Sequence, residues 1–193
     1  VTGTDGFYAR DNISVSATTT VKNVGDEKSN TITVTGETKN YIVNKSEGTL
    51  KINPTDKVVV TIKENSSSVT YNGEVQSVTG YTIESITIKG EETGLYTEKD
   101  FHYAGTDANK TAQGTDAGTY PMTLTPELFV NDNSNFTEVE FVIIDGNLTI
   151  NPKPVELSTK SNEWTYDGEE HSEPDVTGTD GFYARDNISV SAT

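Results

Sequence analysis

Hydrophobic and polar residues alternate in four short stretches of the chain. In each stretch the apolar side chains lie two residues apart, which places them on one face of a β-strand and the polar side chains on the other. They are Ile32 and Val34 in 31–36, Ile86 and Ile88 in 84–90, Tyr120, Met122 and Leu124 in 119–125, and Leu148 and Ile150 in 146–150. The pattern predicts short β-strands with one buried face.

Turn-forming pairs separate these stretches: Glu47-Gly48, Asn72-Gly73, Asp145-Gly146 and Asp167-Gly168. Asn-Gly and Asp-Gly pairs suit hairpins whose turn residues need positive φ. Good helix formers are scarce, and only residues 125–132, with Pro126 near the start, are expected to hold one helical turn. Short strands with frequent turns indicate an all-β fold of small Ig-like β-sandwich modules, with β-grasp-like open sheets as the alternative.

The chain contains a long repeat. Residues 1–18 and residues 176–193 have the same sequence at all eighteen positions, so the block returns after 175 residues. Chance does not produce an identity of this length. The chain is therefore interpreted as slightly more than one period of a tandem array.

A weaker repeat lies inside that period. GTLKINP at 48–54 corresponds to GNLTINP at 146–152, and each is followed by a polar, strand-like run that ends in a Tyr-x-Gly turn, at 71–73 and at 166–168. One period then holds a complete 98-residue module at 55–152 and a 77-residue module that is divided between the two ends of the chain. Residues 1–54 are its C-terminal part, and residues 153–193 are the N-terminal part of the next one.

The divided module has a physical consequence. Neither end of the chain holds every strand that a closed hydrophobic core needs, and small domains bury little of their surface even when they are complete. We therefore expect the half-modules to pack against neighbouring repeats, including head-to-tail copies of the same chain.

Composition narrows the partners. The formal net charge of −16 disfavours phosphate backbones, so nucleic acid is not an expected partner. It also disfavours anionic membrane surfaces, and no apolar run approaches the length of a membrane-spanning helix. The charge is interpreted as keeping a long exposed protein soluble, with divalent-cation binding as the alternative.

The sequence offers no catalytic constellation. The two histidines, His102 and His171, lack zinc-type partners at helical spacing, and the chain has no cysteine. It contains neither a nucleophile elbow nor a phosphate-binding loop. No enzyme activity, catalytic residue, cofactor-binding residue or cofactor is predicted.

Two kinds of hidden stabilising chemistry are considered. Calcium prefers clustered oxygen ligands, and the run Asn131-Asp132-Asn133-Ser134-Asn135, joined by Asp107 and Asp116, is the candidate site, with a solvated loop as the alternative. An intramolecular isopeptide bond would need a lysine, an asparagine and a buried acid together. Lys51, Lys63 and Lys153 lie on strand-like segments, but the sequence identifies no such trio.

Several motifs, taken in order along the chain, resemble the MBG and YDG families of bacterial Ig-like repeat domains. The resemblance covers nearly the whole chain, although each motif is short. It rests on residues 40–43 (NYIV), 47–50 (EGTL), 69–73 (VTYNG), 116–120 (DAGTY), 146–150 (GNLTI) and 165–168 (TYDG). One departure is the sequence NVGDE at 23–27, which takes the place of DAGTY in the short module and puts the local turn there in doubt.

The resemblance implies an extracellular, surface-anchored protein and offers no catalytic residues. The expected role is a structural stalk or spacer of a bacterial adhesin that projects a binding region from the cell surface. The alternatives are that the repeats bind a host glycan or glycoprotein directly, or that they self-associate into a fibre. Tyr8, Tyr41, Tyr96 and Tyr103 are candidate binding anchors, and Trp164 is interpreted as a packing residue.

Overall fold

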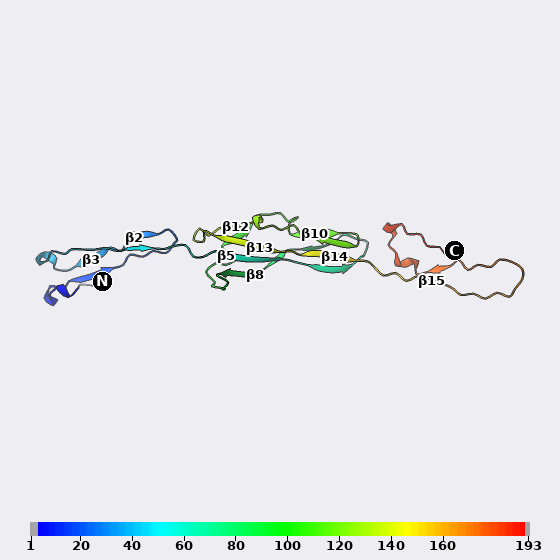
Figure 1. The fold of residues 1–193 in the computed structure, drawn as a ribbon, viewed down its shortest axis with the longest axis horizontal. Coiled ribbons are helices and arrows are strands. Elements are labelled where there is room, and N and C mark those ends of the chain that lie inside the picture. The colour runs from blue at the N-terminus through cyan, green and yellow to red at the C-terminus, as the bar shows by residue number, and fades with distance from the viewer. Residues whose placement is uncertain (1–3, 192–193) are drawn as a thin grey trace. The chain divides into compact units, whose positions relative to one another are not determined.

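The regular secondary structure of the chain is mostly β-strand, as the alternating pattern predicts. The structure, a computed structural model, describes residues 4–191. Its helical segments in that range are 3₁₀ turns of three residues, and one of them, η4 (Pro126–Leu128), is the expected turn with Pro126 at its start. Most strand pairs are antiparallel (Figure 1). The all-β expectation is therefore confirmed.

The chain divides into two compact units. One comprises Val1–Val59, Ile86–His102 and Val130–Glu140, and the other comprises Val60–Ser85, Tyr103–Phe129 and Phe141–Thr193. The chain passes from one unit to the other within five strands. Three of them, β5 (Val58–Glu64), β8 (Tyr81–Ile88) and β13 (Val139–Ile144), form a sheet in the order β13-β5-β8, and β9 (Phe101–Tyr103) pairs with β12 (Phe129–Asn131).

The first unit contains two small antiparallel ladders. Strand β1 (Ser14–Ala17) pairs with β3 (Ile32–Thr35), and β2 (Glu27–Ser29) pairs with β4 (Thr49–Lys51), so that Lys28 lies opposite Leu50. Three 3₁₀ turns belong to this unit as well: η1 (Thr4–Gly6), η2 (Ala9–Asp11) and η3 (Thr38–Asn40). Ile32 and Val34 share one face of β3 as predicted, but they are only half-buried.

The second unit holds a hydrophobic core built on a three-stranded sheet. Strand β14 (Asn147–Asn151) lies between β11 (Gly118–Pro121), which is antiparallel to it, and β6 (Ser67–Thr70), which is parallel. Strand β7 (Gln76–Thr79) pairs with β10 (Thr111–Gly114). The alternation at 146–150 and at 119–125 is confirmed, because Leu148, Ile150 and Met122 pack together with Ala112 in this core.

Residues 153–191 also belong to the second unit but have little regular structure. Strand β15 (Ser158–Thr159) pairs with β16 (Val176–Thr177), and the 3₁₀ turns η5 (Thr179–Gly181) and η6 (Ala184–Asp186) follow. No residue in the described parts of 1–54 and 153–193 is fully buried, since the buried hydrophobic residues all fall between Val58 and Ile150. The half-modules thus lack a closed core of their own.

Residues 4–12 and the identical residues 179–187 adopt the same local conformation. In both, a 3₁₀ turn over Thr-Asp-Gly is followed by a second over Ala-Arg-Asp. Asn12 and Asn187 both have φ of 47°, in the left-handed region that asparagine tolerates, and each donates its backbone N–H over 3.4 Å to the alanine three residues before it. This local sequence therefore fixes its own turn.

The Tyr-x-Gly turns at 71–73 and 166–168 are alike in detail. Gly73 and Gly168 have φ of 79° and 88°, which glycine adopts without strain. The side-chain oxygens of Asn72 and Asp167 accept the backbone N–H two residues ahead, at 2.9 and 3.0 Å. This agrees with the correspondence that the sequence indicates between the two segments.

The hairpins expected at Asn72-Gly73 and Asp145-Gly146 are wrong. Strands β6 and β7, which flank Asn72-Gly73, belong to different sheets, and so do β13 and β14, which flank Asp145-Gly146. Gly146 has no positive φ; a Cβ there would lie 2.5 Å from the carbonyl oxygen of Asn65, so the glycine is required by a close backbone approach. The turn pairs mark changes of sheet instead of hairpins.

Candidate functional site

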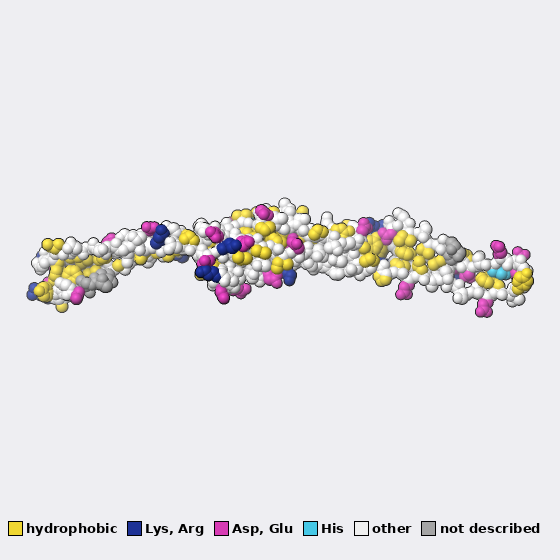
Figure 2. All heavy atoms as spheres, in the orientation of Figure 1, with side chains coloured by type: hydrophobic (Ala, Val, Ile, Leu, Met, Phe, Trp, Pro, Cys, Tyr) yellow, Lys and Arg dark blue, Asp and Glu magenta, His cyan; other side chains and the backbone are white. Residues whose placement is uncertain are grey.

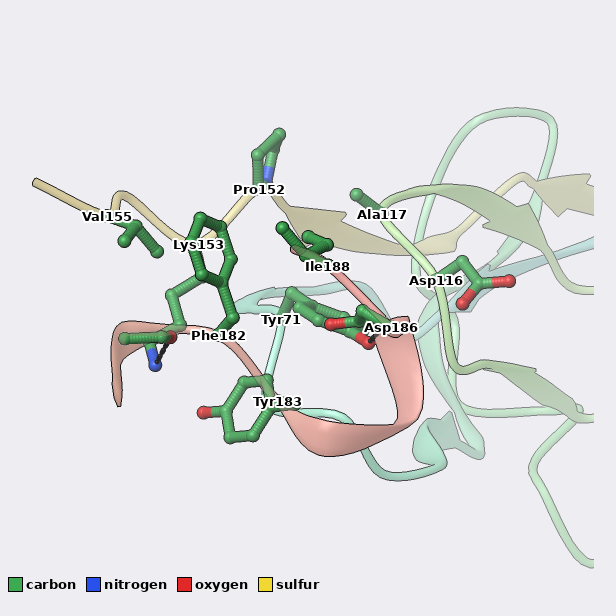
Figure 3. Close-up of a pocket in the computed structure, with 11 residues that line it drawn as sticks. Tyr71, Asp116, Ala117, Pro152, Lys153, Val155, Phe182, Tyr183, Asp186 and Ile188 are labelled. Carbon is green, nitrogen blue, oxygen red and sulfur yellow. Dashed lines mark hydrogen bonds between the residues drawn. The ribbon is translucent and has the colours of Figure 1, made fainter. Parts of the chain in front are cut away.

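A cavity of about 250 Å³ lies in the second unit, where residues of the segment after β14 come back to pack near Tyr71. Its apolar lining includes Tyr71, Pro152, Val155, Phe182, Tyr183 and Ile188 (Figure 3). We call this cavity, together with the contacts of Gly73, Asp116, Lys153, Arg185 and Asp186 around it, the joint. It brings the Tyr-x-Gly turn at 71–73 against the second copy of the repeated segment.

Tyr71 is the centre of the joint. Its hydroxyl donates a hydrogen bond to the carboxyl of Asp186, and its ring meets that of Tyr183 edge to face with centroids 5.5 Å apart. Because the neutral phenol donates this bond, the Asp186 contact raises the pKa of Tyr71. The Lys153 ammonium donates to the Gly181 carbonyl and lies 4.3 Å from the centre of the Tyr183 ring.

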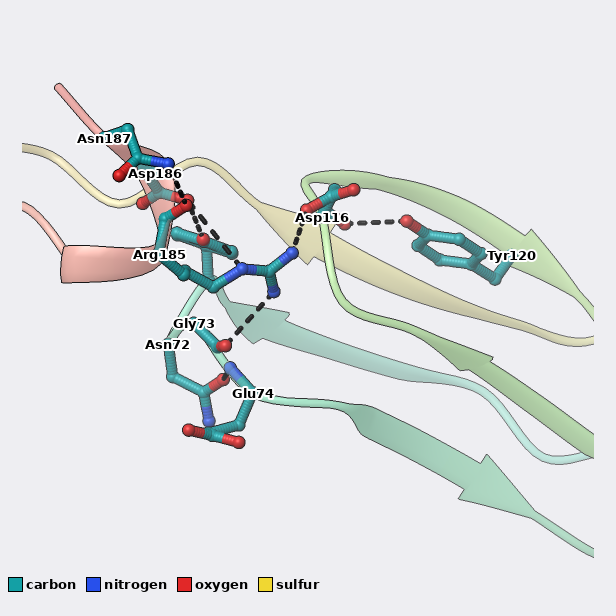
Figure 4. Close-up of polar contacts among 9 residues, drawn as sticks. Asn72, Gly73, Glu74, Asp116, Tyr120, Arg185, Asp186 and Asn187 are labelled. Carbon is teal, nitrogen blue, oxygen red and sulfur yellow. Dashed lines mark hydrogen bonds and ion pairs between the residues drawn. The ribbon is translucent and has the colours of Figure 1, made fainter.

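Arg185 adds polar contacts at the edge of the joint (Figure 4). Its guanidinium donates to the carbonyl oxygen of Gly73 at 3.1 Å and to a carboxyl oxygen of Asp116 at 3.2 Å. Gly73 also leaves room for Tyr183, since a Cβ at this position would lie 3.0 Å from the Tyr183 ring. These contacts specify both the position and the orientation of the 182–187 segment.

The first copy of this segment also binds a tyrosine through its aspartate, but a different ring of the segment packs on that tyrosine. In residues 7–12 (FYARDN), Asp11 accepts the hydroxyl hydrogen bond of Tyr41, and the ring of Phe7 packs edge to face on Tyr41 at 5.0 Å. The Asp11 contact raises the pKa of Tyr41. A carboxylate has two acceptor oxygens, so one aspartate of the repeat has an acceptor oxygen for each of the two tyrosines.

The loop at 23–27, where the sequence departs from the family pattern, is closed by a different device. The Asp26 carboxyl accepts the backbone N–H groups of Lys22 and Asn23, both at 2.9 Å, and these bonds hold the pKa of Asp26 below its ordinary value. In the corresponding loop of the long module, the hydroxyl of Tyr120 donates to the Asp116 carbonyl at 2.9 Å. Different side chains thus close the two loops.

The proposed calcium ligands form hydrogen bonds among themselves and with neighbouring residues. Among the described residues, no group of three or more His, Asp or Glu side chains could hold a metal ion. Asp107 and Asp116 lie in the other unit from the 131–135 run and form ion pairs with Lys110 at 2.9 Å and with Arg185. The contacts of the run are Tyr96 to Asn131 at 3.0 Å, His102 to Asp132 at 2.7 Å, Asn133 to Asp100 at 2.7 Å and Val24 to Asn135 at 2.8 Å.

Three of the four candidate aromatic anchors pack against other residues, and of these Tyr96 is buried while Tyr41 and Tyr103 are half-buried. Tyr41 holds the 7–12 segment, Tyr96 is 2% exposed, and Tyr103 packs against Phe129. Only Tyr8, at 68% exposed, presents most of its surface. Trp164, interpreted as a packing residue, is 47% exposed and stacks on the ring of His171.

The lysines considered for an isopeptide bond have other partners. Lys51 pairs with Glu27 at 3.1 Å, Lys63 pairs with Glu84 at 3.7 Å, and Lys153 is held at the joint. The acid that is fully buried among the described residues is Glu64, and its two carboxyl oxygens accept backbone N–H groups. No lysine–asparagine–acid trio forms among these groups.

Tyr96 is a buried tyrosine whose pKa is strongly raised. Its hydroxyl donates to the Asp100 carbonyl at 3.1 Å and to Asn131, and burial raises its pKa to about 12. A raised pKa means that the neutral phenol stabilises the folded state below the unfolded value of about 10, and that this stabilisation is lost as the pH rises from about 10 to about 12.

We therefore expect absorbance at 295 nm to show a last ionisation step near pH 12. In Tyr96→Phe this last step should disappear. Tyr8→Phe, which changes an exposed ring, is the matched control and should leave this last step in place. A last step that survives in Tyr96→Phe would contradict this assignment.

The charged side chains in view are scattered, and the helices are turns of three residues. On the face in view, acidic and basic side chains are interspersed among mostly uncharged atoms (Figure 2). None of the helices in residues 4–191 has the length and apolarity that crossing a bilayer requires. Comparison of the chain with protein-family models, with curated proteins and with solved structures gives no match. The resemblance to the MBG and YDG families accordingly stays an expectation from the motifs.

Sequence reasoning missed the main residues of the joint, Arg185 and Asp186. The signal that could have found them is the repeat itself, because the only segment present twice in full is the one that contains them. A charged Arg-Asp pair between two aromatic residues and an asparagine is also unusual for a plain solvated turn.

Proposed function

We propose that this chain is a structural spacer repeat of a bacterial cell-surface protein, built of small Ig-like modules in tandem. The observation that carries the proposal is the paired use of one aspartate: Asp11 binds Tyr41, and its counterpart Asp186 binds Tyr71 of the preceding long module. In a continuous array, the same aspartate binds both tyrosines and fixes each module to the one before it.

The chemistry of the joint suits a spacer. Apolar packing around Tyr71 and Tyr183 supplies contact area, while the bonds of Arg185 to Gly73 and Asp116 restrict rotation. Pro152, directly after β14, limits the backbone between the modules. The high negative charge keeps such an array soluble and discourages its side-by-side association.

Direct binding of a host glycan or glycoprotein is the less favoured role. It needs an exposed aromatic cluster, because aromatic residues supply most of the binding energy at recognition surfaces. Of the four tyrosines considered as anchors, Tyr8 alone is largely exposed. Trp164 and Tyr166 are exposed as well, and we assign their segment to strand pairing below. A spacer accounts for the packed tyrosines, whereas a binding surface does not.

The spacer role is tested by the length of tandem arrays in solution. One, two and three copies of the 175-residue period are prepared, and small-angle X-ray scattering gives their maximum dimension. Fixed joints make this dimension rise in proportion to the number of copies, whereas a flexible string grows about 1.7-fold from one copy to three.

Variants of the joint sharpen this test. Changing Tyr71→Ala together with Arg185→Ala in every copy should reduce the growth toward that of a flexible string. Lys63→Ala, which removes an ion pair outside the joint, should leave it proportional. String-like growth of the unmodified arrays would refute the spacer role. The surface location is tested separately by labelling intact cells with an antibody against the chain, and an absence of labelling would refute it.

A further inference from the structure

Two corresponding strands of the chain have different numbers of neighbours. Strand β14 lies between β11 and β6, whereas β4, which carries the matching GTLKINP sequence, has only β2 beside it among the described residues. The pairing with β2 matches that of β14 with β11, since Leu50 lies opposite Lys28 and Leu148 lies opposite Tyr120. One edge of β4 is thus left without the neighbour that β14 has.

The sequence contains a segment that corresponds to this neighbour. Strand β6 directly precedes the Tyr-x-Gly turn at 71–73, and residues 162–165 directly precede the matching turn at 166–168. Residues 162–165 form no strand, and they expose an unusual amount of aromatic surface: Trp164 is 47% exposed and Tyr166 is 94% exposed. An unpaired strand edge and an unpaired aromatic segment therefore correspond to two strands that pair with each other in the long module.

We propose that the open edge of β4 binds residues 162–165 of a second copy of this chain as a parallel strand. The register follows from β14 and β6, where Leu148, Thr149, Ile150 and Asn151 lie opposite Ser67, Ser68, Val69 and Thr70. Transferred to the short module, it places Leu50, Lys51, Ile52 and Asn53 opposite Asn162, Glu163, Trp164 and Thr165.

This register is chemically complementary. Lys51 faces Glu163, so opposite charges lie side by side, and Trp164 lies beside Ile52, which covers apolar surface on both. The backbone N–H of Tyr71 donates to the Asn151 carbonyl at 2.8 Å, and the corresponding bond joins Tyr166 to Asn53. An exposed strand edge with free backbone groups is also the usual site at which another chain adds a strand.

Because of the repeat, one chain can replace strand β1 of a second copy without loss of contacts. Residues 162–165 are followed in the same chain by 176–193, whose sequence is that of residues 1–18. Residues 189–192 therefore match β1 and replace it against β3 of the second copy with the same side chains. The β1–β3 pairing is conserved in the exchange, and the pairing at the β4 edge is the net gain.

Association of the 193-residue chain tests the proposal. Sedimentation equilibrium from about 1 µM to about 1 mM, the range of moderate to weak affinities, should show head-to-tail dimers and larger species. Trp164 is the only tryptophan, and its emission should shift to shorter wavelength over the same concentrations as it becomes buried. Trp164→Ser should weaken association about tenfold without disturbing the fold, because this ring is half-exposed in the single chain.

Paired cysteines test the register, because the chain has no cysteine of its own. Neighbouring strands lie about 4.8 Å apart, and a disulfide bridges residues whose Cα atoms are about 4.4–6.8 Å apart, so opposite residues are within reach. A mixture of Lys51→Cys and Glu163→Cys chains should form the interchain disulfide about tenfold faster than a mixture of Lys51→Cys and the matched control Glu173→Cys.

Three outcomes would overturn the proposal. The first is a chain that stays monomeric at every concentration, and the second is an equal rate of disulfide formation in the two mixtures. The third is a monomeric chain whose Trp164 emission is blue-shifted at every concentration. The last would mean that β4 pairs with residues 162–165 of its own chain. The proposal depends on the correspondence of the modules and not on the spacer role. Tandem arrays can therefore lengthen in proportion while the single chain fails to associate, and the two ideas are refuted separately.

Discussion

Glu64→Ala is expected to lower the free energy of unfolding of the second unit by about 3 kcal/mol, because two buried backbone N–H groups would lose their acceptor at about 1–3 kcal/mol each. Glu64 is 3% exposed. Its Oε1 accepts the N–H of Leu124 at 2.9 Å, and its Oε2 accepts the N–H of Gly146 at 2.6 Å. The carboxyl therefore joins the end of β5 to the segment after β11 and to the connection between β13 and β14.

Urea unfolding followed by the near-ultraviolet circular dichroism of the tyrosines measures this loss. The signal of Trp164 is unsuitable on its own, because that residue lies outside the core of the unit. Glu84→Ala, which removes an exposed acid paired with Lys63, is the matched control and should change the stability by less than about 1 kcal/mol. Glu64→Gln keeps a single acceptor oxygen and should fall between the two. A Glu64→Ala chain as stable as the control would contradict the structural role.

The position of Glu64 was contained in the sequence, although its role was not. Period-two alternation from Val58 through Val60 and Ile62 reaches Glu64 on the same strand face, and all four are buried. An acid on a buried face requires hydrogen-bond donors. The donors come from Leu124 and Gly146, which lie 60 and 82 residues away in the sequence, and no local pattern identifies partners at that separation.

The other predictions divide in the same way between features set by local sequence and features set by partners that are distant in the sequence. The strands and the helical turn at Pro126 depend on residues close together in the chain, and the sequence predicts them. The expected hairpins fail because pairing with β14 takes β6 into a parallel ladder some eighty residues away. Tyr96 lies between turn-rich segments without alternation, so nothing local indicated its burial beside Phe101 and Phe136.

Leu148→Ala is expected to lower the free energy of unfolding by about 3 kcal/mol, as for other leucines removed from a closed core. Leu148 is fully buried among Met122, Ile150 and Ala112. Its counterpart Leu50 occupies the same position in GTLKINP but is only half-buried beside β2. Leu50→Ala in the 193-residue chain should therefore cost less than about 1 kcal/mol in the same unfolding measurement.

The contrast between the two leucines should disappear when the short module is complete. A chain of two fused periods contains residues 153–175 followed directly by a second copy of 1–54, so every strand of one short module is present in a single chain. If residues 162–165 cover the edge of β4 there, Leu50→Ala in the second copy removes a buried side chain and should cost about as much as Leu148→Ala. A cost that stays small in the fused chain would mean that Leu50 never enters a closed core, and the correspondence between the two modules would then end at their turns.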